Sequence, residues 1–163
     1  MKFKLFKILF INISLVIFLS TSGAAESGNS NIYIDFTKFE NTKKYNSYIL
    51  CPKDYCKNVT PNKFSPKIEI SMVKLKNILI NIIYVSQRVK FVKYKKNHYQ
   101  FVQKSKVFRF PDIIDVKFLK LDGYVSFIIY SRSKYGLFDF SMNKNRVENW
   151  INQLNSKLNE GLN

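Results

Sequence analysis

The densest set of chemically capable side chains lies between Ser131 and Arg146, where serines, a lysine, an aspartate, an asparagine and an arginine stand close together. Cationic side chains, hydroxyls and the backbone N–H groups at a helix N-terminus together suit an anionic ligand such as a carboxylate or a phosphate. The pattern therefore predicts an anion-binding pocket. Its candidate ligand-binding residues are Ser131, Ser133, Lys134, Asp139, Asn143 and Arg146.

The same residues also fit a purely structural network, and the sequence leaves both interpretations open. On a strand, Ser131 and Ser133 would share one face, and on a helix Asn143 and Arg146, three apart, would share one side. Asp139 could accept hydrogen bonds from the neighbouring cations, and buried charges are tolerated only when they are paired. Such a network would fasten a strand, a loop and a helix at one corner.

Acid–base catalysis has few candidate residues. The single histidine, His98, falls in a predicted hairpin turn among lysines, so we expect a surface residue that does not suit Ser-His-Asp or Cys-His catalysis. Asp112 follows a proline and is expected to cap a turn. In the alternative hypothesis, an enzyme uses Asp112 or Asp139 as acid or base. The five glycines are scattered, which argues against a phosphate-binding glycine-rich loop.

Cys51 and Cys56 are the only cysteines, in the segment Cys-Pro-Lys-Asp-Tyr-Cys. In an oxidising compartment such a close pair favours a local structural disulfide. A redox centre would normally have two intervening residues, and a zinc site would need further ligands. We therefore expect a disulfide, no metal and no cofactor.

Residues 1–25 have the pattern of a secretory signal peptide. Lys2, Lys4 and Lys7 precede an apolar run from Ile8 to Leu19, and small residues follow it. The alternative, a retained membrane anchor, is disfavoured because an apolar span of about 20 residues is needed to cross a bilayer. We expect an exported protein in the periplasm or cell envelope of a bacterium.

The chain is strongly basic. Loss of the three signal lysines, with no acidic residue among residues 1–25, lowers the formal net charge from +16 to +13. Such a charge attracts polyanions, and outside the cytoplasm these are lipid headgroups, cell-wall polymers and acidic proteins rather than nucleic acid. The lysines are spread along the chain, so a lysine-rich surface without any partner explains the charge equally well.

The first part of the mature chain has weak structural signals. Residues 26–49 are interpreted as a flexible lead-in and arm, within which Asn31–Phe36 is either a short strand or a surface-packed arm. Prolines and polar residues predict mostly loop from Thr37 to Pro66. Beyond Pro66, apolar spacing predicts a helix over about Ser71–Tyr84, preceded by an extended Ile68–Ile70.

The second half alternates in the manner of strands. Two hairpins are predicted, one turning at Lys96-Asn97-His98 and one at Asp122-Gly123 with type I′ geometry. A helix then runs to about Leu158, with Ser141 or Asn143 as its cap. The order predicts an α+β domain over residues 50–163, with about four to five antiparallel strands packed with two helices.

These residues resemble a known family. The run Ser131-Arg132-Ser133-Lys134-Tyr135-Gly136-Leu137-Phe138-Asp139, with Asn143 and Arg146, resembles the signature of the bacterial and plastid domain of unknown function 1499 family. Cys51-Pro52, Cys56 and Phe110-Pro111-Asp112 resemble two further elements of that family, and the likeness covers about Leu50–Leu158. The chain departs from the family pattern at three positions. Lys134 replaces an arginine, Ser141 a glycine and Ile113 an aspartate.

The resemblance implies an exported single-domain α+β protein and supplies no activity. We expect a non-catalytic envelope protein that binds an anionic ligand, lipid headgroups or an acidic envelope component. The alternatives are an envelope hydrolase that uses Asp112 or Asp139, and a purely structural or assembly module.

Overall fold

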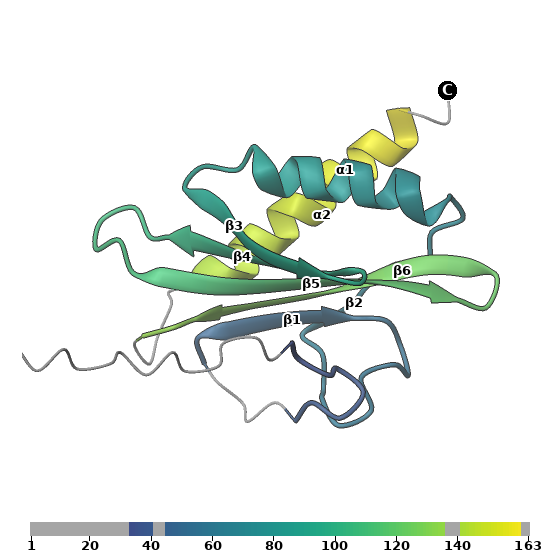
Figure 1. The fold of residues 1–163 in the computed structure, drawn as a ribbon, viewed down its shortest axis with the longest axis horizontal. Coiled ribbons are helices and arrows are strands. Elements are labelled where there is room, and N and C mark those ends of the chain that lie inside the picture. Colours follow the sequence, from purple (N-terminus) through teal and green to yellow (C-terminus); the bar gives the residue numbers. More distant parts are fainter. Residues whose placement is uncertain (1–32, 41–44, 136–140, 161–163) are drawn as a thin grey trace, which may run out of the picture. The chain divides into compact units, whose positions relative to one another are not determined.

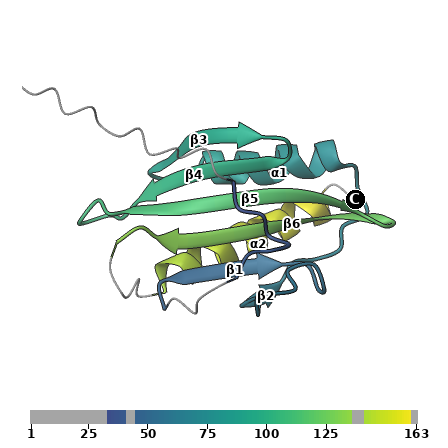
Figure 2. The same ribbon diagram turned by 60° about the horizontal axis from the view of Figure 1, so that its bottom comes forward.

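The structure, a computed structural model, describes residues 33–40, 45–135 and 141–160. Tyr33 onward forms one compact unit, a six-stranded sheet with two helices on one face (Figure 1). The strand order is β2-β1-β6-β5-β4-β3, and only the β1–β2 pair is parallel (Figure 2). The elements are β1 (Ser47–Cys51), β2 (Lys63–Phe64), α1 (Met72–Tyr84), β3 (Val89–Lys95), β4 (His98–Lys104), β5 (Pro111–Leu121), β6 (Tyr124–Ser133) and α2 (Met142–Glu160).

The predicted α+β class is confirmed, and the two extra strands, β1 and β2, lie in the segment predicted to be loop. β1 is buried from Tyr48 to Cys51 and pairs with β6, and β2 pairs only with β1. Neither strand shows a long alternating pattern because β1 is covered on both faces and β2 has only two residues. The sequence signal for these strands was therefore too short to separate from loop.

The helix α1 and both hairpins form where the sequence predicts them. Ser71 caps α1 by accepting a hydrogen bond from the Lys74 N–H at 3.2 Å, and Ile68 bridges to Val125 as an extended segment. The second hairpin turns at Asp122-Gly123, but of the two only Gly123 has a positive φ, +77°. The turn is therefore not type I′, which requires positive φ at both positions.

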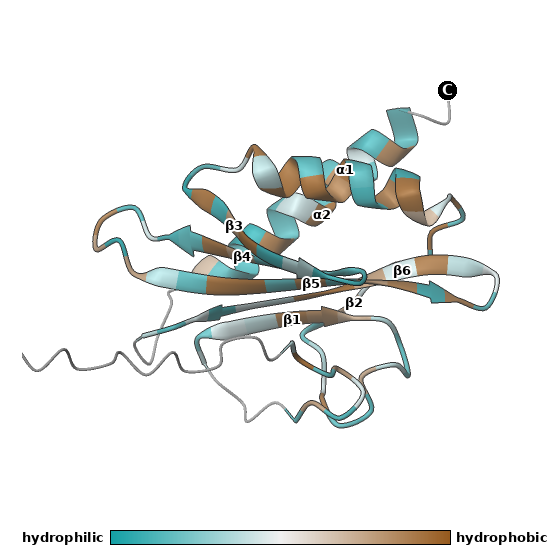
Figure 3. Ribbon diagram, viewed as in Figure 1, coloured by the Kyte–Doolittle hydropathy of each residue, from teal (hydrophilic) through white to brown (hydrophobic). Residues whose placement is uncertain are grey.

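The main core fills the space between the helices and the sheet. Leu75, Leu79 and Ile83 of α1 pack with Trp150 and Leu154 of α2 against the facing side chains of β4, β5 and β6. Hydrophobic residues dominate β5 in the middle of the sheet (Figure 3). At one end of the strands, buried polar side chains take the place of apolar ones on this face of the sheet. These polar residues belong to the candidate functional site.

A smaller core lies on the opposite face of the sheet. Phe36 is fully buried there, and Ile34 and Phe39 pack beside it, so residues 33–39 form an arm across the strands, as one of the two predictions had it. The Cys51–Cys56 disulfide, predicted from the spacing, closes the loop after β1 and belongs to this core.

The predicted signal peptide lies outside the described residues. In the part of the chain that the structure describes, no helix combines the length and the apolar character needed to cross a membrane.

Reduction of the disulfide tests how much this small core depends on the cross-link. Cys51 and Cys56 are five apart, and a loop of this size is expected to contribute about 2 kcal/mol to the free energy of unfolding. We expect dithiothreitol to lower the unfolding free energy of the wild type by that amount in urea titrations. The Cys51→Ala/Cys56→Ala variant is the control, and an equal response of both proteins to the reductant would contradict the prediction.

Candidate functional site

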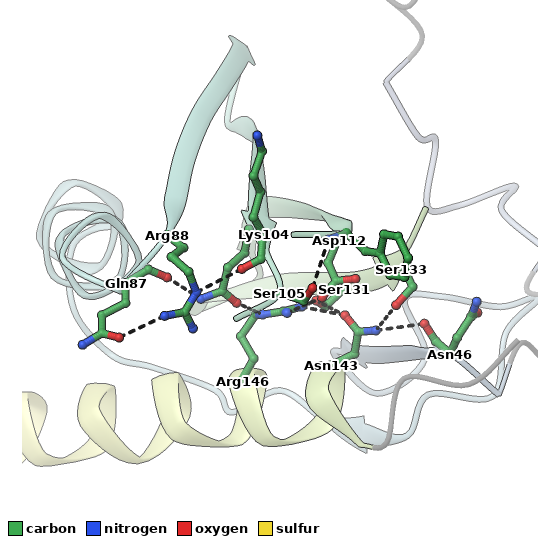
Figure 4. Close-up of polar contacts among 12 residues, drawn as sticks. Asn46, Gln87, Arg88, Lys104, Ser105, Asp112, Ser131, Ser133, Asn143 and Arg146 are labelled. Carbon is green, nitrogen blue, oxygen red and sulfur yellow. Dashed lines mark hydrogen bonds and ion pairs between the residues drawn. The ribbon is translucent and has the colours of Figure 1, made fainter. Parts of the chain in front are cut away.

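Arg146 is the centre of a buried polar network at one end of the helix-covered face of the sheet (Figure 4). Its Nη2 donates to the Asp112 carboxylate, and its Nε donates to Gln103 Oε1. Its Nη1 donates to Ser131 Oγ and to Asn143 Oδ1, each at 2.6 Å. The arginine from α2 is thereby bonded to side chains from β4, β5 and β6.

Asn143 extends this network towards β1. Its side-chain amide donates to the Asn46 carbonyl at 2.9 Å and to Ser133 Oγ at 3.3 Å, while its Oδ1 also accepts from Ser131 Oγ at 2.6 Å. Asn143 is fully buried, although it lies in the first turn of α2. Buried amides must be hydrogen-bonded, so the start of α2 is fixed over the end of the sheet.

Strand and helix periodicities bring these residues together. Ser131 and Ser133 face α2 because alternate residues of β6 share a face, and Asp112 pairs with Ser133 in the β5–β6 register. Asn143 and Arg146 share a side of α2 because they are three residues apart. The contacts of Ser131, Asn143 and Arg146 therefore agree with the second prediction for the segment 131–146, a structural network of hydrogen bonds.

The remaining predicted site residues lie elsewhere. Lys134 is exposed, with its ammonium 5.4 Å from the centre of the Tyr135 ring. Asp139, the predicted partner of the two cations, lies outside the described residues. The prediction that Asp112 caps a turn is wrong, because Asp112 is the second residue of β5 and forms a buried ion pair with Arg146. Sequence reasoning could not anticipate this contact, since the two residues are far apart along the chain.

A cavity of about 440 Å³ opens beside Arg146, between the end of α1, the end of β4 and the first half of α2. Its described lining includes two arginines and five side-chain amides and no acidic residue. The lining residues are Val85, Ser86, Gln87, Arg88, Gln103, Met142, Asn145, Arg146, Asn149, Trp150 and Gln153. Such a lining offers many donors and net positive charge, which suits a polar anion.

Hydrogen bonds to neighbouring residues hold the Arg88 side chain at this cavity. Its φ of +61° is in the left-handed region, a conformation that costs a residue with a side chain roughly 1 kcal/mol. Its Nε donates to the Lys104 carbonyl and its Nη1 to Gln87 Oε1, each at 3.1 Å. Gln103 in turn donates to the Gln87 carbonyl at 2.7 Å. Figure 4 shows these residues continuing the Arg146 network across the sheet.

A larger hollow of about 490 Å³ lies near the other side of the start of α2, and its lining includes Lys63 and Lys144 together with the carboxylate of Glu148. Glu148 is part of its lining and accepts a hydrogen bond from Tyr48 Oη at 3.1 Å. Burial of the Tyr48 hydroxyl, together with this contact to a carboxylate, raises the Tyr48 pKa to about 12. A carboxylate in the wall would repel an anionic ligand.

The predicted surface position of His98 is wrong. His98 begins β4, is buried, and places Nε2 3.0 Å from Asp115 Oδ1 on the face opposite the helices. Its ring packs against Tyr33 and Phe36 of the arm, at 4.9 and 5.7 Å between ring centres. The sequence gives no signal for this burial, because the residues that cover His98 belong to the arm, which is far away along the chain.

Asp115 is the centre of a second polar cluster. Besides the contact with His98, it accepts hydrogen bonds from Arg132 at 2.6 Å and from Gln100 at 2.9 Å. Burial opposes ionisation of this carboxyl, but the His98 bond, the Arg132 charge and the two other bonds outweigh burial and lower the Asp115 pKa. This cluster is covered by the arm and fastens it to the sheet.

The described residues of the two polar clusters form no metal site, and their aspartates are held in ion pairs. Among the residues that the structure describes, no group of three histidine, cysteine, aspartate or glutamate side chains could hold a metal ion. Asp112 and Asp115 each bond to an arginine, and Asp112 is not among the lining residues of the cavity. The geometry instead suits recognition of a ligand at the Arg88 side of the network.

Comparison with known proteins identifies one family. The model of a family described as "Protein of unknown function (DUF1499)" matches residues 30–154, which is most of the chain. This match confirms the resemblance seen in the sequence and begins earlier, so it includes the arm. No curated protein matches the chain.

Loss of either partner of the Arg146–Asp112 pair should strongly destabilise the fold. Removing one partner leaves a buried charge uncompensated, so Arg146→Met and Asp112→Asn should each lower the free energy of unfolding by about 3 kcal/mol or more. Urea titration measures this loss. Glu160→Gln is the control, because the Lys157–Glu160 pair is exposed and its loss should leave the free energy of unfolding nearly unchanged. Equal effects of Arg146→Met and Glu160→Gln would refute a central role for the buried pair.

Asp115 should make stability depend on pH in the acid range. Its pKa is lower in the folded protein than in the unfolded chain, so the folded state binds fewer protons there. This contribution is complete above the ordinary pKa of about 4 and is lost as the pH falls through the lowered folded value. We expect the wild type to lose more unfolding free energy between pH 7 and pH 3 than Asp115→Asn. Parallel pH profiles would contradict this assignment.

Proposed function

The chain belongs to the DUF1499 family, and on that premise we propose that it is an exported, non-catalytic protein that binds a small polar anion in the cavity beside Arg88 and Arg146. The ligand class is a carboxylate or a phosphate. The proposal of export rests on the signal pattern of residues 1–25, and the disulfide is of the kind that persists in an oxidising compartment.

The observation that carries the proposal is the fixed guanidinium of Arg88 at a cavity with no acidic residue in its described lining. Arginine has five N–H donors, and Arg88 uses two of them in bonds to Lys104 and Gln87. The other three make no hydrogen bond to a described residue. A planar fork of this kind matches the oxygens of a carboxylate or phosphate, and holding it in place beforehand lowers the entropy lost on binding.

Arg146 has a different part in this proposal. Its side chain is about 5% exposed, and Asp112 compensates its charge. It therefore supports the wall of the cavity and holds Gln103, which in turn holds Gln87 beside Arg88. Ser131, Ser133 and Asn143, which the sequence proposed as ligand contacts, belong to the same supporting network.

A hydrolase that uses Asp112 gains no support from this geometry. The carboxylate is buried and bonded to Arg146, and it lies outside the lining of the cavity. A general acid or base must be within reach of the proton that it transfers. The binding proposal therefore has the stronger physical basis.

Thermal denaturation with added anions tests the proposal. Inorganic phosphate and succinate are the probes, and a ligand at ten times its dissociation constant stabilises the folded state by about 1.4 kcal/mol. For a domain of this size that raises the midpoint by about 3–6 °C. We expect the rise in wild type with at least one probe and its loss in Arg88→Gln.

Arg109→Gln is the matched control. Arg109 shares a positive φ with Arg88, +58°, and is exposed, but it does not line the cavity. Lys134→Gln should likewise leave the rise intact. Loss of the rise in all three variants would indicate general charge screening and would refute the cavity as the site, as would a wild type that responds to neither probe.

A further inference from the structure

The loop between β4 and β5 exposes an apolar tip. Val107 and Phe108 are 75% and 73% exposed, and Phe110 is 52% exposed. None of the three belongs to either hydrophobic core of the described residues. The loop projects past the end of the sheet in both ribbon views (Figures 1 and 2). An exposed apolar group of this kind is a candidate interaction site.

The loop is held in this shape by its own bonds. The Ser105 N–H donates to the Phe110 carbonyl at 2.9 Å, and the Phe110 N–H donates to Ser105 Oγ at 3.0 Å. The rings of Phe108 and Phe110 stack on each other, with 5.6 Å between their centres. By contrast, the exposed aromatics of β3 pack on other rings of the sheet, as Phe91 does on Phe101. The loop therefore has a defined conformation, and its exposed apolar side chains do not extend either hydrophobic core.

Cations surround the tip. Lys104, the last residue of β4, and Lys106 and Arg109 of the loop are exposed, and no acidic residue occurs between Gln103 and Pro111. The end of β6 adds Lys134 and Tyr135, since the Lys134 N–H donates to the Pro111 carbonyl at 3.0 Å. Tyr135 is 54% exposed. Basic residues around apolar and tyrosine side chains are the composition that binds at the interface of an anionic bilayer.

We propose that the loop 104–110 docks the protein on an anionic lipid bilayer, with Val107, Phe108 and Phe110 entering the interface and the surrounding cations contacting lipid phosphates. The loop projects past the end of the sheet, and a bilayer accepts a projecting apolar loop without a complementary pocket. A second copy of the chain is a poorer occupant, because two such loops would bring their cations together. This inference stands apart from the proposed cavity ligand, since only the loop residues carry it.

Depth-dependent tryptophan quenching tests the docking directly in the full chain. Phe108→Trp places a reporter at the tip, and Phe64→Trp is the matched control because Phe64 is 58% exposed on the edge strand β2, which does not neighbour β4 or β5. The native Trp150 is 2% exposed, so its emission gives a constant background. With equal parts of phosphatidylcholine and phosphatidylglycerol, the Phe108→Trp emission should shift to the blue and be quenched by brominated acyl chains.

The substitutions that remove each part of the surface should weaken binding to the same vesicles. Phe108→Ser should lower the vesicle affinity at least about tenfold, because the variant no longer buries a phenylalanine side chain in the bilayer interface. Lys104→Gln/Lys106→Gln/Arg109→Gln should lower it roughly 100-fold, since each cation near an anionic surface contributes a factor of about five. The charge-matched control, Lys53→Gln/Lys57→Gln/Lys120→Gln, removes three exposed lysines near the far end of the sheet and should have a smaller effect. Circular dichroism checks that each variant is folded.

Three results would overturn the proposal. Equal quenching of the Phe64→Trp and Phe108→Trp variants would mean general adsorption of a basic chain. A Phe108→Trp emission that does not change with anionic vesicles would mean that the tip does not enter the interface. Self-association that Phe108→Ser abolishes, without any vesicle binding, would assign the tip to a second copy of the chain.

Discussion

The fold depends on a guanidinium that is buried at the end of a sheet. A charge in that position is tolerated only if every neighbour is arranged to compensate it, because removing an arginine from water costs several kcal/mol. Arg146 meets this condition through Asp112, Gln103, Ser131 and Asn143, which come from three strands and its own helix. The angle and position of α2 on the sheet are therefore specified by charge compensation as well as by the hydrophobic seam of Val147, Trp150 and Leu154.

A second buried aspartate–arginine ion pair lies on the other face of the sheet. Asp112 and Asp115 are three residues apart in β5, and an odd separation on a strand places them on opposite faces. Asp112 meets Arg146 under α2, and Asp115 meets Arg132 under the arm. The two pairs act differently on the layers that cover the sheet. Arg146 belongs to α2 and ties that helix to β5, whereas Arg132 belongs to β6, so the second pair lies within the sheet and the arm packs on it through the rings of Tyr33 and Phe36 against His98.

Local patterns predicted most of the fold but few of the contacts. The helix α1, the Asp122-Gly123 hairpin and the shared helical side of Asn143 and Arg146 follow from residues close in sequence, and all three are present. His98 and Asp112 were misassigned, because their burial depends on partners that only tertiary folding supplies. The Arg88 cavity was missed for a related reason: its lining comes from α1, β4 and α2, and each residue taken singly resembles ordinary surface.

The architecture accounts for several residues of the family signature. Ser131, Asn143 and Arg146 match the family pattern and are buried in the network. Lys134 departs from it and is exposed, so its side chain is not required by the corner. Ser141 departs from it at a φ of +63°, the left-handed conformation that glycine adopts at least cost, which explains a glycine in the family pattern at the start of α2. The signature residues therefore specify how a helix is fastened to a sheet end, and the proposed ligand chemistry rests on the less regular residues around Arg88 that this corner holds in place.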